Sequence, residues 1–231
     1  MKIIINADDF GANDGINKAV ESACQDGCLN SASILVYGIR TQNAVQIAKN
    51  NPKLKIGLHA EFNSGFVKIM LASIFFPNKT KTKIESELRK QIAECKNLGI
   101  TKLSHLDSHR HIHMLPEIFQ IFKRIAAEYK IPRVRVTNER SLSVKGLVLT
   151  VLRFLSRAHS NIYFVSFGNT KNKIIVPRKY NAAEIAFHPM AFTNTNGAKN
   201  FGERRFYFSP RRLYEYKIIM NPDFPKNTLI F

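Results

Sequence analysis

Short apolar runs alternate with segments of helical apolar spacing along most of this chain. The predicted strands span residues 2–7, 31–36, 55–59, 103–107, 133–137, 162–165, 184–188 and 228–231. The predicted helices span residues 14–26, 41–50, 81–98, 116–129, 145–157 and 209–220. Between them, residues 60–79 are expected to be irregular. Strands that alternate with helices are typical of an α/β fold with a parallel sheet. No linker or repeat interrupts the pattern, so we expect one domain over residues 1–231.

Chemically active side chains come at the ends of several predicted strands. They are Asp8 and Asp9 after the first strand, His59 at the end of the third, Asp107 and His109 after the fourth, and His188 at the end of a late strand. Because the carboxyl ends of parallel strands lie on one face of such folds, we expect these side chains to meet. Two imidazoles and a carboxylate leave open positions on a metal ion, as in catalytic sites. A second carboxylate can then serve as general base and an opposed histidine as general acid.

The segment 103–113 carries four of the chain's seven histidines. From residue 105 onward, every second position of this segment carries a histidine or an aspartate, namely His105, Asp107, His109, His111 and His113. This period places side chains on one face of a strand, and Pro116 then begins a helical pattern. We therefore predict a strand that ends near Asp107, a loop that carries histidines, and a helix. Imidazole is the commonest metal ligand, and a neighbouring carboxylate can bind the same ion or orient the ring.

Each of these residues also has a structural explanation when it is taken alone. Asp8 or Asp9 can cap a turn, and His59 can be a buried core histidine. His188 precedes a proline and can belong to a turn, and the histidine-rich segment can be a solvated loop. A shared site explains all of these positions together, whereas the separate explanations must each hold independently.

Taken together, these motifs resemble the YdjC-like carbohydrate deacetylases, the chitooligosaccharide deacetylase family. The matching segments are residues 5–11, 57–59, 105–113 with the following Pro116, and 184–189. The resemblance implies a distorted TIM-like (β/α) barrel and a divalent metal ion, Mg²⁺ or Zn²⁺. Its ligands would be Asp9, His59 and His109. It also implies that Asp8 is the base and His188 the acid in removal of an N-acetyl group from an acetylated amino sugar or oligosaccharide, free or lipid-linked.

Two other functions are also compatible with the sequence. A different metallohydrolase on the same barrel could act on a phosphoester, because a fold does not fix a function. A basic protein could instead bind anionic lipid or nucleic acid and keep only a structural metal site. We expect His105, His111 and His113 to orient metal ligands or to have structural roles.

The charge of the chain favours anionic partners. Lys and Arg number 35 against 17 Asp and Glu, so the formal net charge is +18 at pH 7. The absence of zinc-finger spacing, RNP-like aromatic motifs and heptads argues against nucleic acid. Residues 145–157 form an amphipathic pattern with a basic polar face. They are either an ordinary barrel helix with its apolar side inward or an interfacial helix on an anionic membrane.

The compartment is predicted from what the sequence lacks. Three cysteines are too few, and odd in number, for a disulfide framework. No secretory leader pattern begins the chain, and no apolar run approaches the length of a membrane span. We therefore expect a cytoplasmic protein, with peripheral association at the inner membrane face as an alternative. The expected partner is a small-molecule or glycan substrate, with an anionic membrane surface as a second possibility. The family resemblance, rather than any interface pattern in the sequence, implies a homo-oligomer.

Overall fold

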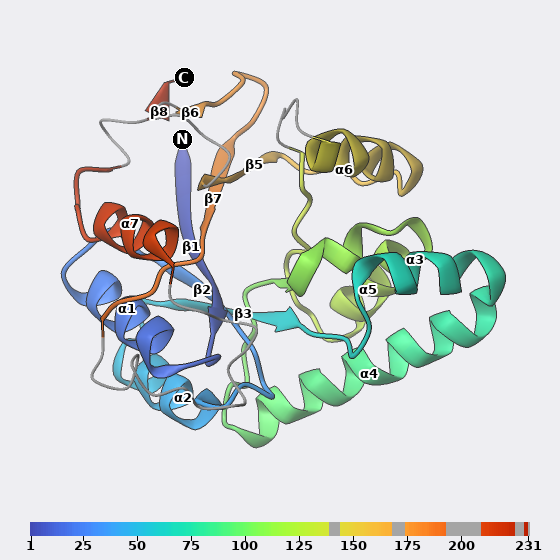
Figure 1. Ribbon diagram of the computed structural model, residues 1–231, viewed down its shortest axis with the longest axis horizontal. Helices are drawn as coiled ribbons and strands as arrows, with labels where there is room; N and C mark the ends of the chain where they lie inside the picture. The colour runs from blue at the N-terminus through green and yellow to red at the C-terminus, as the bar shows by residue number, and fades with distance from the viewer. Residues whose placement is uncertain (139–143, 168–173, 193–208, 225–228, 231) are drawn as a thin grey trace.

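A curled parallel sheet forms the centre of the molecule. The computed structural model describes residues 1–138, 144–167, 174–192, 209–224 and 229–230. The strand order is β4-β3-β2-β1-β7-β5, and every pair is parallel. The strands are β1 (Lys2–Phe10), β2 (Ser31–Ile34), β3 (Lys55–Ala60), β4 (Leu106–Ser108), β5 (Ile162–Ser166) and β7 (Ala182–Phe187). The predicted distorted TIM-like (β/α) barrel is confirmed, with the sheet curled into a half-barrel among helices (Figure 1).

Helices lie on either side of the strands in the view of Figure 1, with α1, α2 and α7 to the left of β1 and α3 to α6 to the right. Their bounds are α1 (Asp14–Gln25), α2 (Thr41–Asn50), α3 (Phe66–Phe75), α4 (Pro77–Asn97), α5 (Pro116–Glu128), α6 (Val144–Leu155) and α7 (Pro210–Ile219). The 3₁₀ segment η1 (His109–Met114) joins β4 to α5. A separate parallel pair consists of β6 (Ile174–Ile175), which the sequence did not predict, and β8 (Leu229–Ile230).

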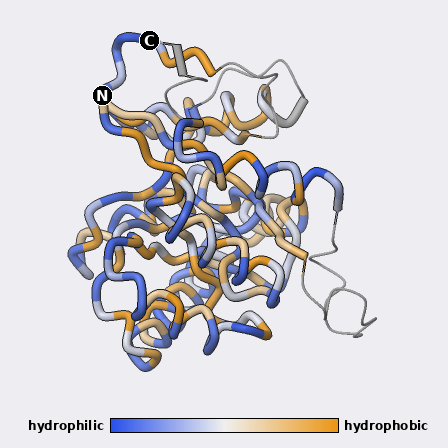
Figure 2. The backbone as a smooth tube through the Cα atoms, turned by 90° about the vertical axis from the view of Figure 1, so that its left-hand side faces the viewer, coloured by the Kyte–Doolittle hydropathy of each residue, from blue (hydrophilic) through white to orange (hydrophobic). Residues whose placement is uncertain are grey.

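The burial of the central strands explains their composition. Ile5 and Ala7 of β1 and Ile185 and Phe187 of β7 are all buried. Parallel strands covered on both faces are expected to be almost continuously apolar, as these are. Elsewhere, hydrophobic and hydrophilic stretches alternate over short distances along the backbone (Figure 2), as expected of elements with one buried face. The polar residues at the C-terminal ends of β1 and β7 therefore stand out from an apolar background.

The strand predicted over residues 133–137 is wrong. Val134 forms only an isolated bridge with Leu106, although Arg133 and Arg135 both make backbone hydrogen bonds to that residue. The reason is that β4 has only three residues and offers no longer edge for pairing. The segment therefore lies beside β4 without extending the sheet.

The irregular segment predicted over residues 60–79 is also wrong in part. It contains α3, and α4 begins at Pro77 rather than at residue 81. Proline is favoured in the first turn of a helix because its missing N–H is not needed there. The apolar run before Pro77 forms α3 and contacts α4, so two helices replace the predicted excursion.

Candidate active site

The C-terminal ends of four strands bring the predicted polar residues into one region. The residues are Asp8 and Asp9 in β1, His59 in β3, Asp107 in β4, His109 at the start of η1, and His188 directly after β7. In this region, three sets of three residues each place their ligand atoms close enough together to bind one metal ion. One of these sets is Asp9, His59 and His109. The structure therefore brings together all of the residues to which the sequence assigned chemistry.

An irregularity in β1 places both of its aspartates at the site. Neighbouring residues of a regular strand point to opposite faces. Here the register between β1 and β2 shifts between Ala7 and Phe10, and Asp9 has a φ of 66°. A left-handed backbone at a residue other than glycine costs on the order of 1–3 kcal/mol and is typical of functional sites. The shift lets Asp8 and Asp9 contact different groups of the same site.

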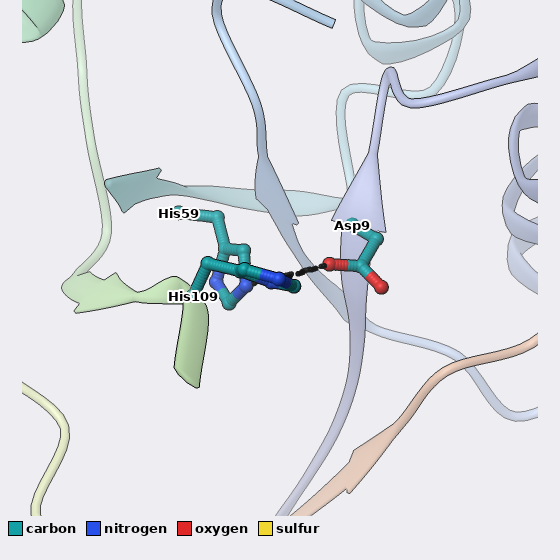
Figure 3. A group of neighbouring side chains, drawn as sticks. All are labelled: Asp9, His59 and His109. Atoms are coloured by element: carbon teal, nitrogen blue, oxygen red, sulfur yellow. Dashed lines mark ion pairs between the residues drawn. The ribbon is translucent and has the colours of Figure 1, made fainter. Parts of the chain in front are cut away.

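Asp9, His59 and His109 form the candidate metal centre. The Oδ1 atom of Asp9 lies 3.5 Å from His59 Nε2 and 3.4 Å from His109 Nδ1, and Figure 3 shows both imidazoles directed at this carboxylate. Asp9 Oδ1 is buried, yet it accepts no well-formed hydrogen bond from the described residues. A buried oxygen without a partner is energetically costly. One carboxylate oxygen facing two ring nitrogens is a donor set that fits a divalent metal ion and leaves positions open.

Asp107 orients the His59 ring by contacting the nitrogen that does not face Asp9. His59 Nδ1 lies 2.6 Å from Asp107 Oδ1, which leaves Nε2 to face Asp9. Burial alone would lower the pKa of His59, but Asp107 and the two aspartates of β1 outweigh it and raise this pKa to about 9. The ring is thus an electron-rich ligand whose proton a bound cation would replace. Asp107 itself accepts a hydrogen bond from Ser33 Oγ at 2.8 Å.

The second oxygen of Asp9 is held by α7. Arg212 Nη2 donates to Asp9 Oδ2 at 2.8 Å. Burial opposes ionisation of Asp9, but the side chain of His109, followed by His188, holds its pKa well below the usual range. His59 and Arg212 act in the same direction. Asp9 is therefore ionised, as a metal ligand must be.

Asp8 lies next to the centre and is held by Arg135. It accepts a bidentate pair of hydrogen bonds from Arg135 at 2.9 and 2.8 Å, and a further one from Asn6 Nδ2 at 2.8 Å. Burial raises the pKa of Asp8, but Arg135 and then His59 outweigh it and hold the pKa below its usual value. His188 Nε2 lies 3.8 Å from Asp8 Oδ2, and the His188 side chain is 35% exposed. One carboxylate and one accessible imidazole therefore flank the candidate metal centre.

Two arginines of the site were missed by sequence reasoning. Arg135 is fully buried, and besides Asp8 it contacts Asp107 and Glu184, each at 2.8 Å. Arg212 comes from α7 and holds Asp9 Oδ2. The only signal for Arg135 was its place between two valines in a predicted strand, which does not show where its side chain points.

The remaining histidines of the 105–113 segment lie away from the Asp9 carboxylate. Burial lowers the pKa of His105 and of His113 to about 4 each, so both are neutral. His105 packs across Gly57, where an added Cβ would lie 2.3 Å from the ring. His113 Nδ1 lies 2.8 Å from Ser108 Oγ, and the His111 ring packs edge-on against Phe164. These contacts are those of residues that support the shape of the site.

A hollow of about 30 Å³ lies beside the candidate centre. Its walls include His109 and Arg110 of η1 and the segment that connects β3 to α3. Arg110 and His111 both have left-handed backbones, with φ of 59° and 57°, and this turn allows His109 to point at the centre. Phe62 belongs to this hollow and also to a larger cavity of about 280 Å³ between α3 and α4.

The fold and the site define an α/β barrel protein whose strand ends carry a carboxylate–imidazole centre able to hold a divalent cation. The chain belongs to the YdjC-like protein family, which matches it over residues 2–228. The family resemblance stated from the sequence motifs is confirmed.

Several relatives share the name carbohydrate deacetylase. The protein of Vibrio parahaemolyticus serotype O3:K6 (strain RIMD 2210633) is 36% identical over 205 residues, which are 82% of this chain and 78% of that protein. The protein of Vibrio cholerae serotype O1 (strain ATCC 39541) is 36% identical over 146 residues, 57% of this chain and 58% of the relative. That of Oceanobacillus iheyensis is 32% identical over 147 residues, 57% of this chain and 64% of the relative.

A solved structure supports the fold. A proposed cellobiose-phosphate cleavage protein from Enterococcus faecalis V583 superposes with a TM-score of 0.65 over 100% of this chain and 96% of that chain. The sequences are only 17% identical, so this similarity concerns the architecture alone.

Proposed function

We propose that this protein is a carbohydrate deacetylase that hydrolyses the N-acetyl group of an acetylated amino sugar or oligosaccharide. The observation that carries the proposal is the convergence of Asp9, His59 and His109 beside the Asp8–His188 pair. The relatives named carbohydrate deacetylase support the same reaction. Neither a phosphoester substrate nor a purely structural metal site is favoured by these relatives.

Asp9, His59 and His109 would hold the metal ion, Mg²⁺ or Zn²⁺. When bound, such an ion polarises the acetyl carbonyl and lowers the pKa of water. Asp107 keeps the His59 ring in the orientation needed for binding. Arg212 holds the second oxygen of Asp9, which leaves Oδ1 directed at the centre.

Asp8 and His188 would move the protons. Asp8 is kept ionised by Arg135 and accepts the proton of the attacking water. His188, which is partly exposed beside Asp8, donates a proton to the leaving amine nitrogen. A positioned acid or base typically contributes about 10²–10⁴-fold in rate. The amide bond is broken between the carbonyl carbon and that nitrogen, and the products are acetate and a free amine.

Acetate release from N-acetylated sugars tests the proposal. The purified protein is stripped with a chelator and assayed on free and lipid-linked acetylated sugars after addition of Mg²⁺, Zn²⁺ or Co²⁺. We expect activity to fall on stripping and to return with at least one ion. A phosphoester substrate assayed in parallel should not be hydrolysed. Phosphate release without acetate release would favour the phosphoesterase instead. The cytoplasm is the compartment in which we propose that this reaction takes place.

A further inference from the structure

Helix α6 exposes most of its apolar side chains. The exposed fractions are Leu147 64%, Val148 41%, Val151 50%, Phe154 81% and Leu155 57%. Of the two explanations left open for residues 145–157, the barrel helix with its apolar side inward does not describe most of that side. Such large exposed apolar groups on one helix are unusual unless another surface covers them.

The exposed and buried residues of α6 lie on distinct faces. Leu147, Val151 and Phe154 follow a spacing of four and three residues and form one stripe. Leu149 and Leu152 are buried on another side of the helix. Arg153 lies on the remaining side and Arg157 follows the helix. An apolar face next to basic residues is the pattern of a helix that lies in a membrane interface.

Helix α3 repeats this arrangement. Its exposed apolar residues are Val67 61%, Leu71 45%, Ile74 64% and Phe75 69%, and Phe76 at its end is 65% exposed. Ile69 alone in this helix is buried. Lys68 is exposed beside the stripe. Among the described residues, no helix combines the length and the apolar character that crossing a membrane requires.

The two helices flank the same segment of the active site. Both α3 and α6 contact η1, which begins with the candidate ligand His109, and both lie on the right-hand side of Figure 1. The cavity of about 280 Å³ between α3 and α4 has apolar walls that include Ile69 and Phe76. Lys68, Lys79 and Lys83 also line it, against one acidic residue, Glu87, so cationic groups outnumber anionic ones beside the apolar walls.

The charge of this region indicates which kind of partner covers the exposed apolar residues of α3 and α6. Neither α3 nor α6 contains an acidic residue, whereas Lys68 lies in α3, Lys145 and Arg153 lie in α6, and Arg157 follows α6. In the neighbouring helix α4, Lys79 and Lys83 line the cavity together with one acidic residue, Glu87. The whole chain carries +18. A second copy of this chain would bring the same positive charge to the contact, whereas an anionic lipid surface complements it.

We propose that the exposed apolar stripes of α3 and α6 form a docking surface for an anionic lipid membrane. The apolar side chains enter the boundary between headgroups and acyl chains, and the neighbouring lysines and arginines contact the anionic headgroups. The docking places η1 and the mouth of the candidate site close to the lipid surface. This surface does not depend on the reaction that the site performs.

Vesicle co-sedimentation tests the docking surface. The intact protein is mixed with phosphatidylcholine vesicles with and without phosphatidylglycerol, at low and at high salt. We expect binding only with phosphatidylglycerol, and we expect it to weaken as salt rises, because salt screens exposed charges. Absence of binding to anionic vesicles at low salt would overturn the proposal, and so would equal binding to both kinds of vesicle.

Three variants locate the contact. Phe154→Ser and Ile74→Ser should each reduce the vesicle partition coefficient by about tenfold, which is the order expected when one large apolar side chain is no longer buried. Ile175→Ser changes a residue of β6 that is about as exposed as Ile74, at 66% against 64%, and this variant should bind as the unmodified protein does. Analytical sedimentation of the same variants without lipid tests whether a second copy of the chain covers the stripe instead. A dimer that dissociates in Phe154→Ser would assign the stripe to a second copy and overturn the lipid proposal.

Discussion

His59 and Asp107 are paired in register on the adjacent strands β3 and β4, and His59 Nδ1 lies 2.6 Å from Asp107 Oδ1. The same ring presents Nε2 to Asp9 at 3.5 Å. A carboxylate in this position fixes the tautomer and orientation of a metal-binding imidazole. The register of two strands therefore supplies the orientation, and Asp107 need not bind the ion to influence it.

Replacing Asp107 should weaken metal binding without removing a ligand. Asp107→Asn should lower the affinity for the divalent ion about 10- to 100-fold, because outer partners of metal ligands typically have effects of that size. Titration calorimetry on chelator-stripped protein measures the affinity. Glu117→Gln, at a side chain that is 60% exposed on α5, is the matched control and should bind metal normally. An unchanged affinity in Asp107→Asn would remove the orienting role.

Removal of a proposed ligand should remove the metal itself. His59→Ala and His109→Ala each eliminate one of the two imidazoles facing Asp9, so most of the bound metal should be lost. Elemental analysis of the purified proteins gives the metal content, and circular dichroism checks that the fold is retained. His159→Ala changes an exposed histidine and should keep full occupancy. Full occupancy in both ligand variants would show that the ion binds elsewhere.

The aspartates and histidines of the site were predictable because each ends a recognisable apolar run. Asp9, His59 and His188 needed only strand boundaries and the rule that parallel strands end together. The arginines could not be found in this way. Arg135 meets Asp8 across 127 positions of sequence, and Arg212 meets Asp9 across 203. Such contacts depend on the packing of distant elements, which local patterns do not report.

The errors in the predicted fold also arise where the structure depends on neighbouring elements rather than on local sequence patterns. The alternation of strands and helices predicted the parallel sheet, because it depends on periodicity within each segment. Whether residues 133–137 pair depends on the length of the neighbouring edge, and β4 is too short to make them a strand. The direction of the apolar face of α6 likewise depends on its neighbours. Amphipathicity alone does not show whether an apolar face is turned inward or outward.

The proton-transfer roles predict a loss of rate at constant metal content. Asp8→Asn should retain the ion, because the candidate ligands are untouched, and should lose about 10²–10⁴-fold in rate. His188→Ala should lose a similar factor, with the smallest loss for substrates that have good leaving groups. Steady-state acetate release, paired with elemental analysis, separates these effects. Normal turnover of metal-loaded Asp8→Asn would require another base.

The pairing of Glu184 with two arginines predicts a pH-dependent contribution to stability. Its Oε1 accepts from Arg135 Nε at 2.8 Å, and its Oε2 is paired with Arg133. Burial would raise the pKa of Glu184, but Arg135 and then Arg133 hold it below the ordinary value. The stabilisation is therefore fully present above the unfolded-state pKa of about 4.3, and it is lost as pH falls through the lower folded-state value.

Glu184→Gln tests this contribution, because it removes the charge and keeps the shape. At pH 7 the free energy of unfolding should fall by about 1.5–3 kcal/mol, the usual worth of a hydrogen bond to a charged group. Below about pH 4 the difference from the unmodified protein should narrow, because the unfolded-state carboxylate then binds a proton while the native one is still ionised, and it should vanish once the native carboxylate is protonated too. Urea unfolding at both pH values measures it, with the exposed Glu117→Gln expected to stay within about 0.5 kcal/mol throughout. A difference that stays constant with pH would show that the buried ion pairs of Glu184 do not stabilise the fold through its charge.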